Sequence, residues 1–440
     1  MGLLEQAESA NTENKTKRNL LRNIFILIAA FLWITAFFIK CRKPAAEAEK
    51  NVSLSFVHWW EDQLEEGTLA SITEEFEARY PRINIKPEYI PYGTLQKRLQ
   101  DSAEETKVPG DIIALDPRWA GMLKQNDLLL ALDDAAGEPA SGSSFISSPG
   151  NEFPDIIPLV SFINVLFYNI DILSEQGFDR PPKNRGEFLS YARTIGNSAA
   201  PKQSLVLALG KGNADGIYED IYSWIWASGQ QMMSEGRPGF SSAQTLEILG
   251  FLRQLYDEKL LEQGLFSNTG RDKLKQFAEG NACMMTGPVS AIAALRKENP
   301  GLNFGITVIP GSSAYFGKPI FSSHCWYAGI LKESAHPEEA LLFLSFLDEK
   351  STALGLASHG IPWESAAINE YIDQDPLYGK AFDIYSAGES SGEFYCNPNP
   401  FSFEDIVRQE VIRFFNRLQS AEETAERINS QWEALIDRQS

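Results

Sequence analysis

Aromatic and acidic side chains stand next to one another just after the first predicted strand. Trp59 and Trp60 are followed directly by Glu61 and Asp62. Indole rings offer flat apolar surfaces, and carboxylates accept hydrogen bonds from hydroxyl groups. This combination suits a small ligand that carries several hydroxyls and a weakly apolar face.

The place of these residues in the chain favours a binding role. Ligands of open α/β sheets gather beyond the carboxyl ends of the strands. Two adjacent tryptophans cannot both enter one core, because successive strand residues point to opposite faces. We therefore expect Trp59 or Trp60 to face a ligand, and the alternative is packing of the loop against a helix. Glu61 and Asp62 either accept hydroxyl protons or serve only as favourable charges at a helix N-terminus.

Catalytic and metal-binding patterns find little support in the sequence. The four histidines show no H-E-x-x-H spacing, and no Walker loop is present, so the usual zinc and nucleotide chemistry is not indicated. A glycosidase needs two carboxylates at a fixed separation. Glu61, Asp62 and Asp116 are candidates, but acidic residues are common in a chain with 59 of them. We expect a protein that is not an enzyme and that needs no cofactor and no metal.

Composition limits the class of protein further. The chain has 440 residues, of which 43% are hydrophobic, which is enough for two domains with sizeable cores. The formal net charge of −20 disfavours nucleic acid as a partner, because phosphates repel an acidic surface. No C-x-x-C pair occurs among Cys41, Cys283, Cys325 and Cys396. We read Cys283 as a small apolar strand residue and leave open whether Cys325 and Cys396 form a disulfide.

An apolar run near the N-terminus predicts a membrane segment. Residues 24–39 are almost entirely apolar, and four basic residues precede them, which favours an inside N-terminus. No small-x-small cleavage site lies just after the run, so we favour an uncleaved anchor. A lipoprotein signal ending at Cys41 and a cleaved signal stay as alternatives, and all three place residue 50 onward outside the cytoplasmic membrane. The predicted segments are residues 1–18 in the cytoplasm, 19–40 as the anchor and 41–51 as a linker.

Hydrophobic periodicity predicts an α/β architecture. Apolar residues alternate over residues 52–56, recur at helical spacing over 69–80, and form short strand patterns at 83–87 and 111–115. Strands that alternate with helices indicate layers of helices on a sheet. Near the C-terminus, a helical stripe runs over Val407, Val411, Phe414 and Leu418, and Ser420 with Glu423 forms a capping box for a last helix.

Five segments in a fixed order carry a family resemblance. They are residues 162–188 (FINVLFYNIDILSEQGFDRPPKNRGEF), 277–288 (FAEGNACMMTGP), 304–310 (FGITVIP), 326–344 and 360–362 (GIP). Together they resemble the family 1 extracellular solute-binding proteins of ABC importers, of the maltose-binding type. The resemblance covers roughly residues 52–435.

The resemblance implies a two-lobed periplasmic-binding-protein-like fold of type II, with a hinge between two α/β lobes. It places residues 52–162 and 303–330 in the first lobe, and residues 163–302 and 331–440 in the second. Its members bind a solute in the cleft between the lobes and deliver it to a membrane permease. For this chain it implies a monomer that binds a sugar or oligosaccharide. A membrane-tethered sensor of the same fold and an anchored glycoside-acting enzyme are the alternatives.

Further candidate ligand contacts come from the resemblance alone. Asp116 and Trp119 follow the third strand pattern, where the family supplies an acidic and an aromatic contact, and Tyr92 lies in a loop that often contributes another. Trp226, Gly287 and Trp363 lie in segments that border the cleft in the family. Surface turns or core packing are the alternatives for these residues. Val289 stands where the family often has a stacking tryptophan, which weakens a maltodextrin assignment.

Overall fold

The computed structural model describes residues 52–105, 110–135, 155–199, 202–211, 216–234, 237–262, 264–362, 368–391 and 400–437. The predicted anchor, Cys41, Trp363 and Cys396 lie outside these residues. The chain divides into two compact units, residues 1–52 with 80–84 and residues 53–79 with 85–440. The cavity described below belongs entirely to the second unit. Among the described residues, no helix combines the length and the apolar character needed to cross a membrane.

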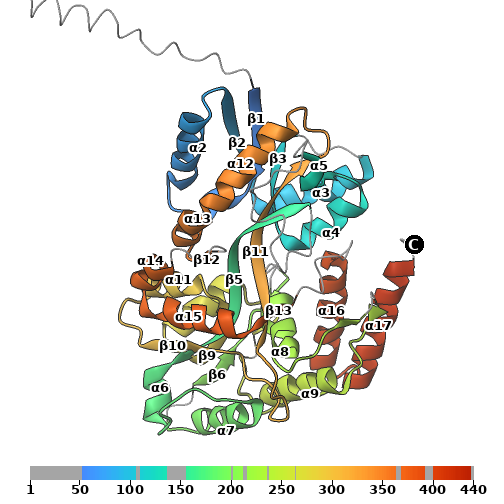
Figure 1. Ribbon diagram of the computed structural model, residues 1–440. Helices are drawn as coiled ribbons and strands as arrows, with labels where there is room; N and C mark the ends of the chain where they lie inside the picture. Colours follow the sequence, from blue (N-terminus) through green and yellow to red (C-terminus); the bar gives the residue numbers. More distant parts are fainter. Residues whose placement is uncertain are drawn as a thin grey trace, which may run out of the picture. The chain divides into compact units, whose positions relative to one another are not determined.

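A mixed sheet forms the centre of the fold (Figure 1), with strands in the order β2-β1-β3-β11-β5-β9-β6. Their bounds are β1 Val52–His58, β2 Ile83–Tyr89, β3 Ile112–Leu115, β5 Ile156–Asn169, β6 Gln203–Val206, β9 Ala282–Pro288 and β11 Ile320–Leu331. β1 pairs parallel with β3, and β6 pairs parallel with β9. β11 and β5 run antiparallel to their neighbours in between. The remaining strands are β4 Leu129–Leu130, β7 Met233–Ser234, β8 Arg237–Pro238, β10 Phe304–Thr307, β12 Ile361–Pro362 and β13 Glu389–Ser391.

Strand β5 connects the two ends of this sheet. Its 14 residues are buried almost without interruption, as expected for a strand that is covered on both faces. Its first half pairs with β11, from Ile156 to Ile163, and its second half pairs with β9, from Asn164 to Tyr168. β10 adds to the same second half.

The helices of the first part of the chain are η1 Trp60–Asp62, α2 Thr68–Arg79, α3 Tyr92–Glu105, α4 Pro117–Gln125 and α5 Leu132–Ala135. Helix α12, Pro337–Glu349, lies beside α2 (Figure 1) although the two are far apart in sequence. The ring of Phe343 on α12 contacts Phe56 of β1 at 5.5 Å and Phe76 of α2 at 5.0 Å between centroids. The predicted boundary at residue 331 would separate α12 from these partners.

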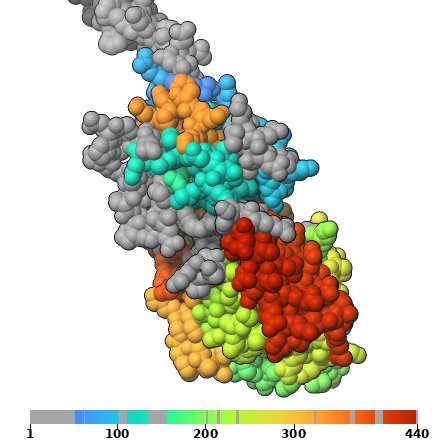
Figure 2. All heavy atoms as spheres, turned by 90° about the vertical axis from the view of Figure 1, so that its right-hand side faces the viewer, coloured from blue at the N-terminus to red at the C-terminus, as the bar shows by residue number. Residues whose placement is uncertain are grey.

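The second part of the chain builds a larger helical layer. Its helices are α6 Ile170–Glu175, α7 Arg185–Gly196, the π-helix η2 Tyr218–Tyr222, α8 Ser223–Trp226, α9 Ala243–Asp257, α10 Gly270–Ala278, α11 Ala291–Glu298, α13 Ser351–Ser358, α14 Ile368–Gln374, α15 Pro376–Ala387, α16 Pro400–Phe415 and α17 Ala421–Asp437. Figure 2 shows the C-terminal helices α16 and α17 as a red patch on the surface, and α17 contacts both α16 and α9. Trp432 of α17 is fully buried in the core that these helices share.

Candidate functional site

A cavity of about 1210 Å³ lies beside the long strands β5 and β11. Its first wall consists of Trp59, Gln63, Leu64, Glu65, Tyr92, Asp116, Arg118, Phe162, Cys325 and Trp326. Its second wall consists of Glu219, Pro288, Ser290, Ile292, Ala293, Ala294, Arg296, Lys297, Ala357, Ser358, His359, Gln374, Asp375 and Tyr378. The volume exceeds the roughly 300–1,000 Å³ of common small-molecule pockets, so the cavity has room for more than one sugar ring.

Aromatic rings line much of the first wall. Trp59 lies directly after β1 and meets Trp119 at 4.8 Å and Tyr92 at 5.6 Å, edge to face in both contacts. Trp60 turns the other way and stacks on Trp326 at 5.0 Å with an interplanar angle of 13°. The rings of Trp59 and Trp60 still contact one another edge to face at 6.2 Å, and both side chains are buried, against the expectation that two adjacent tryptophans do not share a core. Of the two, Trp59 lines the cavity and Trp60 does not.

Asp116 and Arg118 form a buried ion pair at the first wall. Asp116 is the N-cap of α4 and accepts a hydrogen bond from the backbone N–H of Arg118 at 2.9 Å. The guanidinium donates to both carboxylate oxygens, each at 2.9 Å. Tyr92 joins the pair because its hydroxyl lies 3.0 Å from Asp116 Oδ2 and accepts from Arg118 Nη2 at 2.8 Å. Both oxygens of Asp116 are thus already engaged by protein donors.

Arg118 also contacts residues from the other part of the chain. Its Nη1 lies 3.4 Å from Glu404 Oε1 on α16, and the side chains of both residues are buried. Its guanidinium carbon lies 5.7 Å from the ring centroid of Tyr218 and 5.4 Å from that of Phe401, within the usual range for cation–π contact.

A second buried ionic cluster lies behind Glu219. Lys273 on α10 donates to Glu219 at 2.8 Å and to Asp220 at 2.9 Å, and Thr286 on β9 donates to Asp220 as well. Burial by itself would lower the pKa of Lys273, but the two carboxylates outweigh burial and raise that pKa above its usual value. The cluster holds the π-helix η2 against β9 and so positions Glu219 on the cavity wall. π-Helical turns are frequent at functional sites.

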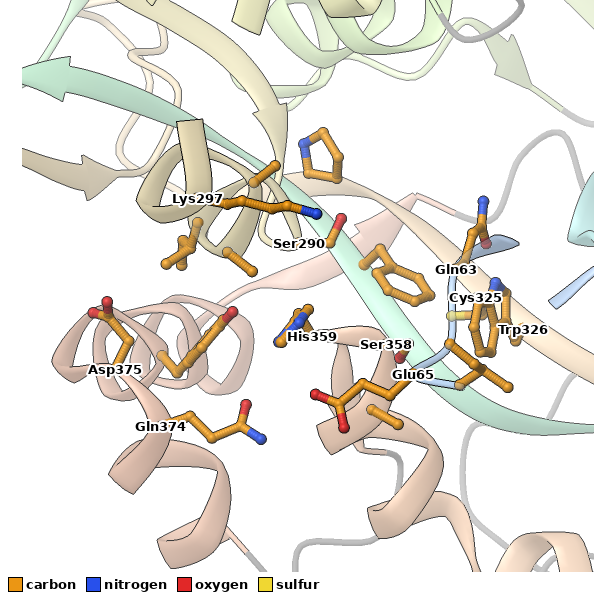
Figure 3. Close-up of a pocket in the computed structure, with 18 of the residues that line it drawn as sticks. Gln63, Glu65, Ser290, Lys297, Cys325, Trp326, Ser358, His359, Gln374 and Asp375 are labelled. Carbon is orange, nitrogen blue, oxygen red and sulfur yellow. The ribbon is translucent and has the colours of Figure 1, made fainter. Parts of the chain in front are cut away.

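The polar end of the second wall lies between α11 and α14–α15 (Figure 3). Lys297 and Ser290 stand on one side, Gln374 and Asp375 on the other, and His359 lies between them. Arg296 donates to Asp375 at 2.7 Å and links α11 to α15. His359 adopts a left-handed backbone with φ of 57° at the C-cap of α13, which directs the chain into Gly360 and β12.

The structure gathers some of the predicted contacts at the cavity and places others behind it. Trp59, Tyr92 and Asp116 line the cavity. Trp60, Trp119 and Trp226 are fully buried and do not line it. Glu61 is exposed outside the lining, and Gly287 is buried on β9 next to the lining residue Pro288. The assignment of these residues as ligand contacts stays a prediction.

Sequence reasoning missed most of the second wall. Glu219, Lys297, His359 and Tyr378 belong to no predicted motif. Two of the motifs lie next to other residues of this wall or to one of these four, since Ser290 follows Gly287-Pro288 and His359 precedes Gly360-Ile-Pro362. For Ser290 and His359, a sequence motif therefore lies within one or two residues of the cavity residue but does not include it.

Within the described residues, no group of three or more His, Cys, Asp or Glu side chains could hold a metal ion. One G-x-S-x-G sequence occurs at residues 388–392. Its Ser390 lies in β13, paired with Phe321, and not at the strand-to-helix turn that exposes a serine nucleophile. Cys283 is buried in β9, and burial raises the pKa of its thiol to about 12, in agreement with a small apolar role.

Comparison with known proteins decides the family. The family model described as bacterial extracellular solute-binding protein matches residues 61–351. The chain belongs to this family. The family is a non-catalytic component of transporters, and its members are extracellular or periplasmic, so the predictions of family, of no enzymatic activity and of a location outside the cytoplasm are confirmed at this level.

Two curated relatives agree with the assignment. A binding protein of Brucella abortus (strain 2308) is 24% identical over 291 residues, which cover 63% of this chain and 68% of the relative. An ABC transporter-binding protein of Deinococcus radiodurans is 22% identical over 295 residues, with the same coverage. The solute-binding protein described here is accordingly an ABC transporter component that binds a small solute.

Solved structures share the fold. The maltose-bound protein of T. maritima superposes with a TM-score of 0.69 at 19% identity, covering 87% of this chain and 100% of that one. The cyclic alpha-maltosyl-1,6-maltose binding protein of Arthrobacter globiformis gives 0.71 at 17% identity, with coverage of 88% and 99%. UgpB of Mycobacterium tuberculosis in complex with glycerophosphocholine gives 0.72 at 18%, also covering 88% and 99%. These likenesses confirm the predicted α/β periplasmic-binding-protein-like fold.

Proposed function

We propose that this solute-binding protein captures a sugar or oligosaccharide in the cavity and delivers it to an ABC permease. The observation that carries the proposal is the wall of Trp59, Tyr92, Phe162 and Trp326. Aromatic faces pack against the C–H faces of sugar rings, and hydroxyl and carboxylate groups at the same wall bind their hydroxyls. Several structural relatives bind maltose or related oligosaccharides, which agrees with this ligand class.

We further propose that the ligand draws two lobes together about a hinge in β5 and β11. β5 pairs with β11 over its first half and with β9 over its second half, and β11 pairs with β13 near its start and with β3 nearer its end, as crossing strands of a hinge must. The predicted lobes, residues 52–162 with 303–330 and residues 163–302 with 331–440, need one change. We assign α12 to the first lobe, because Phe343 packs on Phe56 and Phe76.

The tether to the membrane is proposed from the sequence alone. The apolar run of residues 24–39 with its preceding basic residues favours an anchor that keeps the binding unit next to its permease. Release of the protein from membranes by a salt wash, without detergent, would argue against any tether.

A thermal-unfolding screen of the full-length protein tests the ligand class. The protein is kept in a detergent without a sugar headgroup, and unfolding is followed by tryptophan fluorescence. A ligand that binds only the folded form raises the Tm, because it adds to the free energy of unfolding. The addition is about 2.7 kcal/mol when the ligand concentration is a hundred times Kd. We expect mono- or oligosaccharides to raise it. A shift caused only by amino acids, polyamines or glycerophosphodiesters would refute the carbohydrate assignment.

A further inference from the structure

The polar end of the second wall contains buried groups that the protein itself leaves without hydrogen bonds. The hydroxyl of Tyr378 and Nδ1 of His359 have no partner among the described residues. Tyr378 is 2% exposed, and both residues line the cavity. The two rings lie parallel, with an interplanar angle of 3° and centroids 6.4 Å apart. Buried polar groups are nearly always paired, so these two atoms indicate a ligand group at this end of the cavity.

Hydrogen-bond donors dominate the second wall at this end. Both oxygens of Asp375 are engaged, one by Arg296 and the other by the backbone N–H of Leu377. Lys297 is exposed and has no ion-pair partner in the part of the chain that the structure describes, and an ammonium group only donates. Ser290, at the N-cap of α11, makes no side-chain capping bond and offers a further hydroxyl. Burial raises the pKa of Tyr378, so its hydroxyl keeps its proton.

The other charged groups at the polar end of the second wall do not neutralise the positive charge of Lys297. Arg296 and Asp375 neutralise one another through their ion pair. Glu65 also lines the cavity, but it comes from the first wall and is exposed. Its carboxylate suits ligand hydroxyls, which donate, while Lys297 suits an anionic acceptor. Charge-assisted bonds of this kind are roughly twice as strong as neutral ones.

We propose that Ser290, Lys297, His359 and Tyr378 form a subsite for an anionic group, so that the solute is an acidic saccharide carrying a carboxylate or a phosphate. The rings of the saccharide lie toward Trp59 and Trp326, and the charged group lies between α11 and α15. This inference rests on the carbohydrate-binding function proposed above and narrows it to one chemical class.

Isothermal titration of the full-length protein with matched ligands tests the subsite. The probes are glucuronate against glucose, glucose 6-phosphate against glucose, and 4-O-methylglucuronosyl-xylotriose against xylotriose. We expect at least one acidic member to bind about tenfold more tightly than its neutral partner, and this preference to shrink as salt is added. Preference in the glucuronate pairs alone identifies a carboxylate, and preference in the phosphate pair alone identifies a phosphate.

Variants of Lys297 connect the preference to the subsite. We expect Lys297→Met to abolish the roughly tenfold preference for the acidic member of the pair, and Lys297→Arg to restore most of that preference. Tyr378→Phe should weaken the same acidic probes. Lys380→Met is the matched control, because Lys380 is an exposed lysine of α15 outside the cavity lining. An unchanged Tm shows that each variant is folded.

Two results would overturn the inference. One is equal or tighter binding of the neutral member in every pair, in which case the carbohydrate function stands and only the anionic subsite is lost. The other is an acidic preference that survives Lys297→Met intact. Absence of binding by every saccharide, acidic or neutral, would remove the proposed function itself together with the subsite.

Discussion

At the scale of single residues, the two adjacent tryptophans that follow β1 have different roles, one at the cavity and one in the core. Trp59 lines the cavity, whereas Trp60 is fully buried against Trp326 and Phe56. Removal of Trp60 would therefore act mainly on stability, at the roughly 3–5 kcal/mol cost of emptying a core aromatic site. Trp59 is the better probe of binding.

We expect Trp59→Phe to weaken saccharide binding by about tenfold, because the smaller ring loses part of the stacking surface. The matched control is Trp224→Phe, since Trp224 is fully buried in the second core and does not line the cavity. Titration calorimetry on both variants gives the comparison. If both changes left the Kd equally unaffected, the aromatic first wall would play no part in binding.

The sequence predicted the position of Asp116 near the cavity but not the ion-pair network in which its carboxylate takes part. A polar residue after a buried strand was expected to reach a ligand, and the structure places it at the cavity. Its main partner, Arg118, lies two residues away, within the reach of local reasoning. Glu404, the next partner of that arginine, lies 286 residues further along the chain. No local pattern predicts such a contact, because it depends on how distant helices pack.

At the scale of elements, local sequence signals predicted where the C-terminal helices begin better than where they end. The capping box at Ser420 and Glu423 is confirmed by both of its hydrogen bonds. The stripe of Val407, Val411 and Phe414 is buried on α16, but the extension of that stripe to Leu418 is wrong. α16 ends at Phe415, and Leu418 is 68% exposed. Arg417, with φ of 60°, turns the chain away, and periodicity alone does not reveal a left-handed residue.

The contact between α4 and α16 yields a prediction about stability. Arg118→Met removes the guanidinium that pairs with the buried carboxylates of Asp116 and Glu404, so we expect a loss of about 3–5 kcal/mol in the free energy of unfolding. Urea denaturation followed by far-UV circular dichroism measures it. Arg98→Met is the control, because the pair of Arg98 with Glu88 is exposed and 3.9 Å apart, and such pairs contribute less than about 1 kcal/mol. Equal losses in the two variants would show that burial of the Arg118 network has no energetic consequence.

At the scale of the whole molecule, the same network bears on how the binding unit responds to its solute. Arg118 lies on α4, in the first proposed lobe, and contacts Glu404 and Tyr218, in the second. Contacts of this kind exist only while the lobes are together. They add to the stability of the closed state, and a ligand shifts the population only by its additional affinity for that state. We therefore expect the protein to be partly closed already when it is empty.

Distances between spin labels test this picture. Labels at Lys86→Cys on β2 and Lys275→Cys on α10 occupy exposed positions in the two proposed lobes, with Cys41 and Cys396 replaced by serine. We expect the free protein to show a long and a short distance, and a saccharide to leave mainly the short one, since it selects the closed population. Glu404→Gln should raise the share of the long distance in the free protein, because it removes one charge from the network that joins the lobes. A second pair at Lys275→Cys and Glu426→Cys, both in the second lobe, should not change. A single distance that is identical with and without every saccharide bound by the protein would rule out hinge closure while leaving the cavity as the binding site.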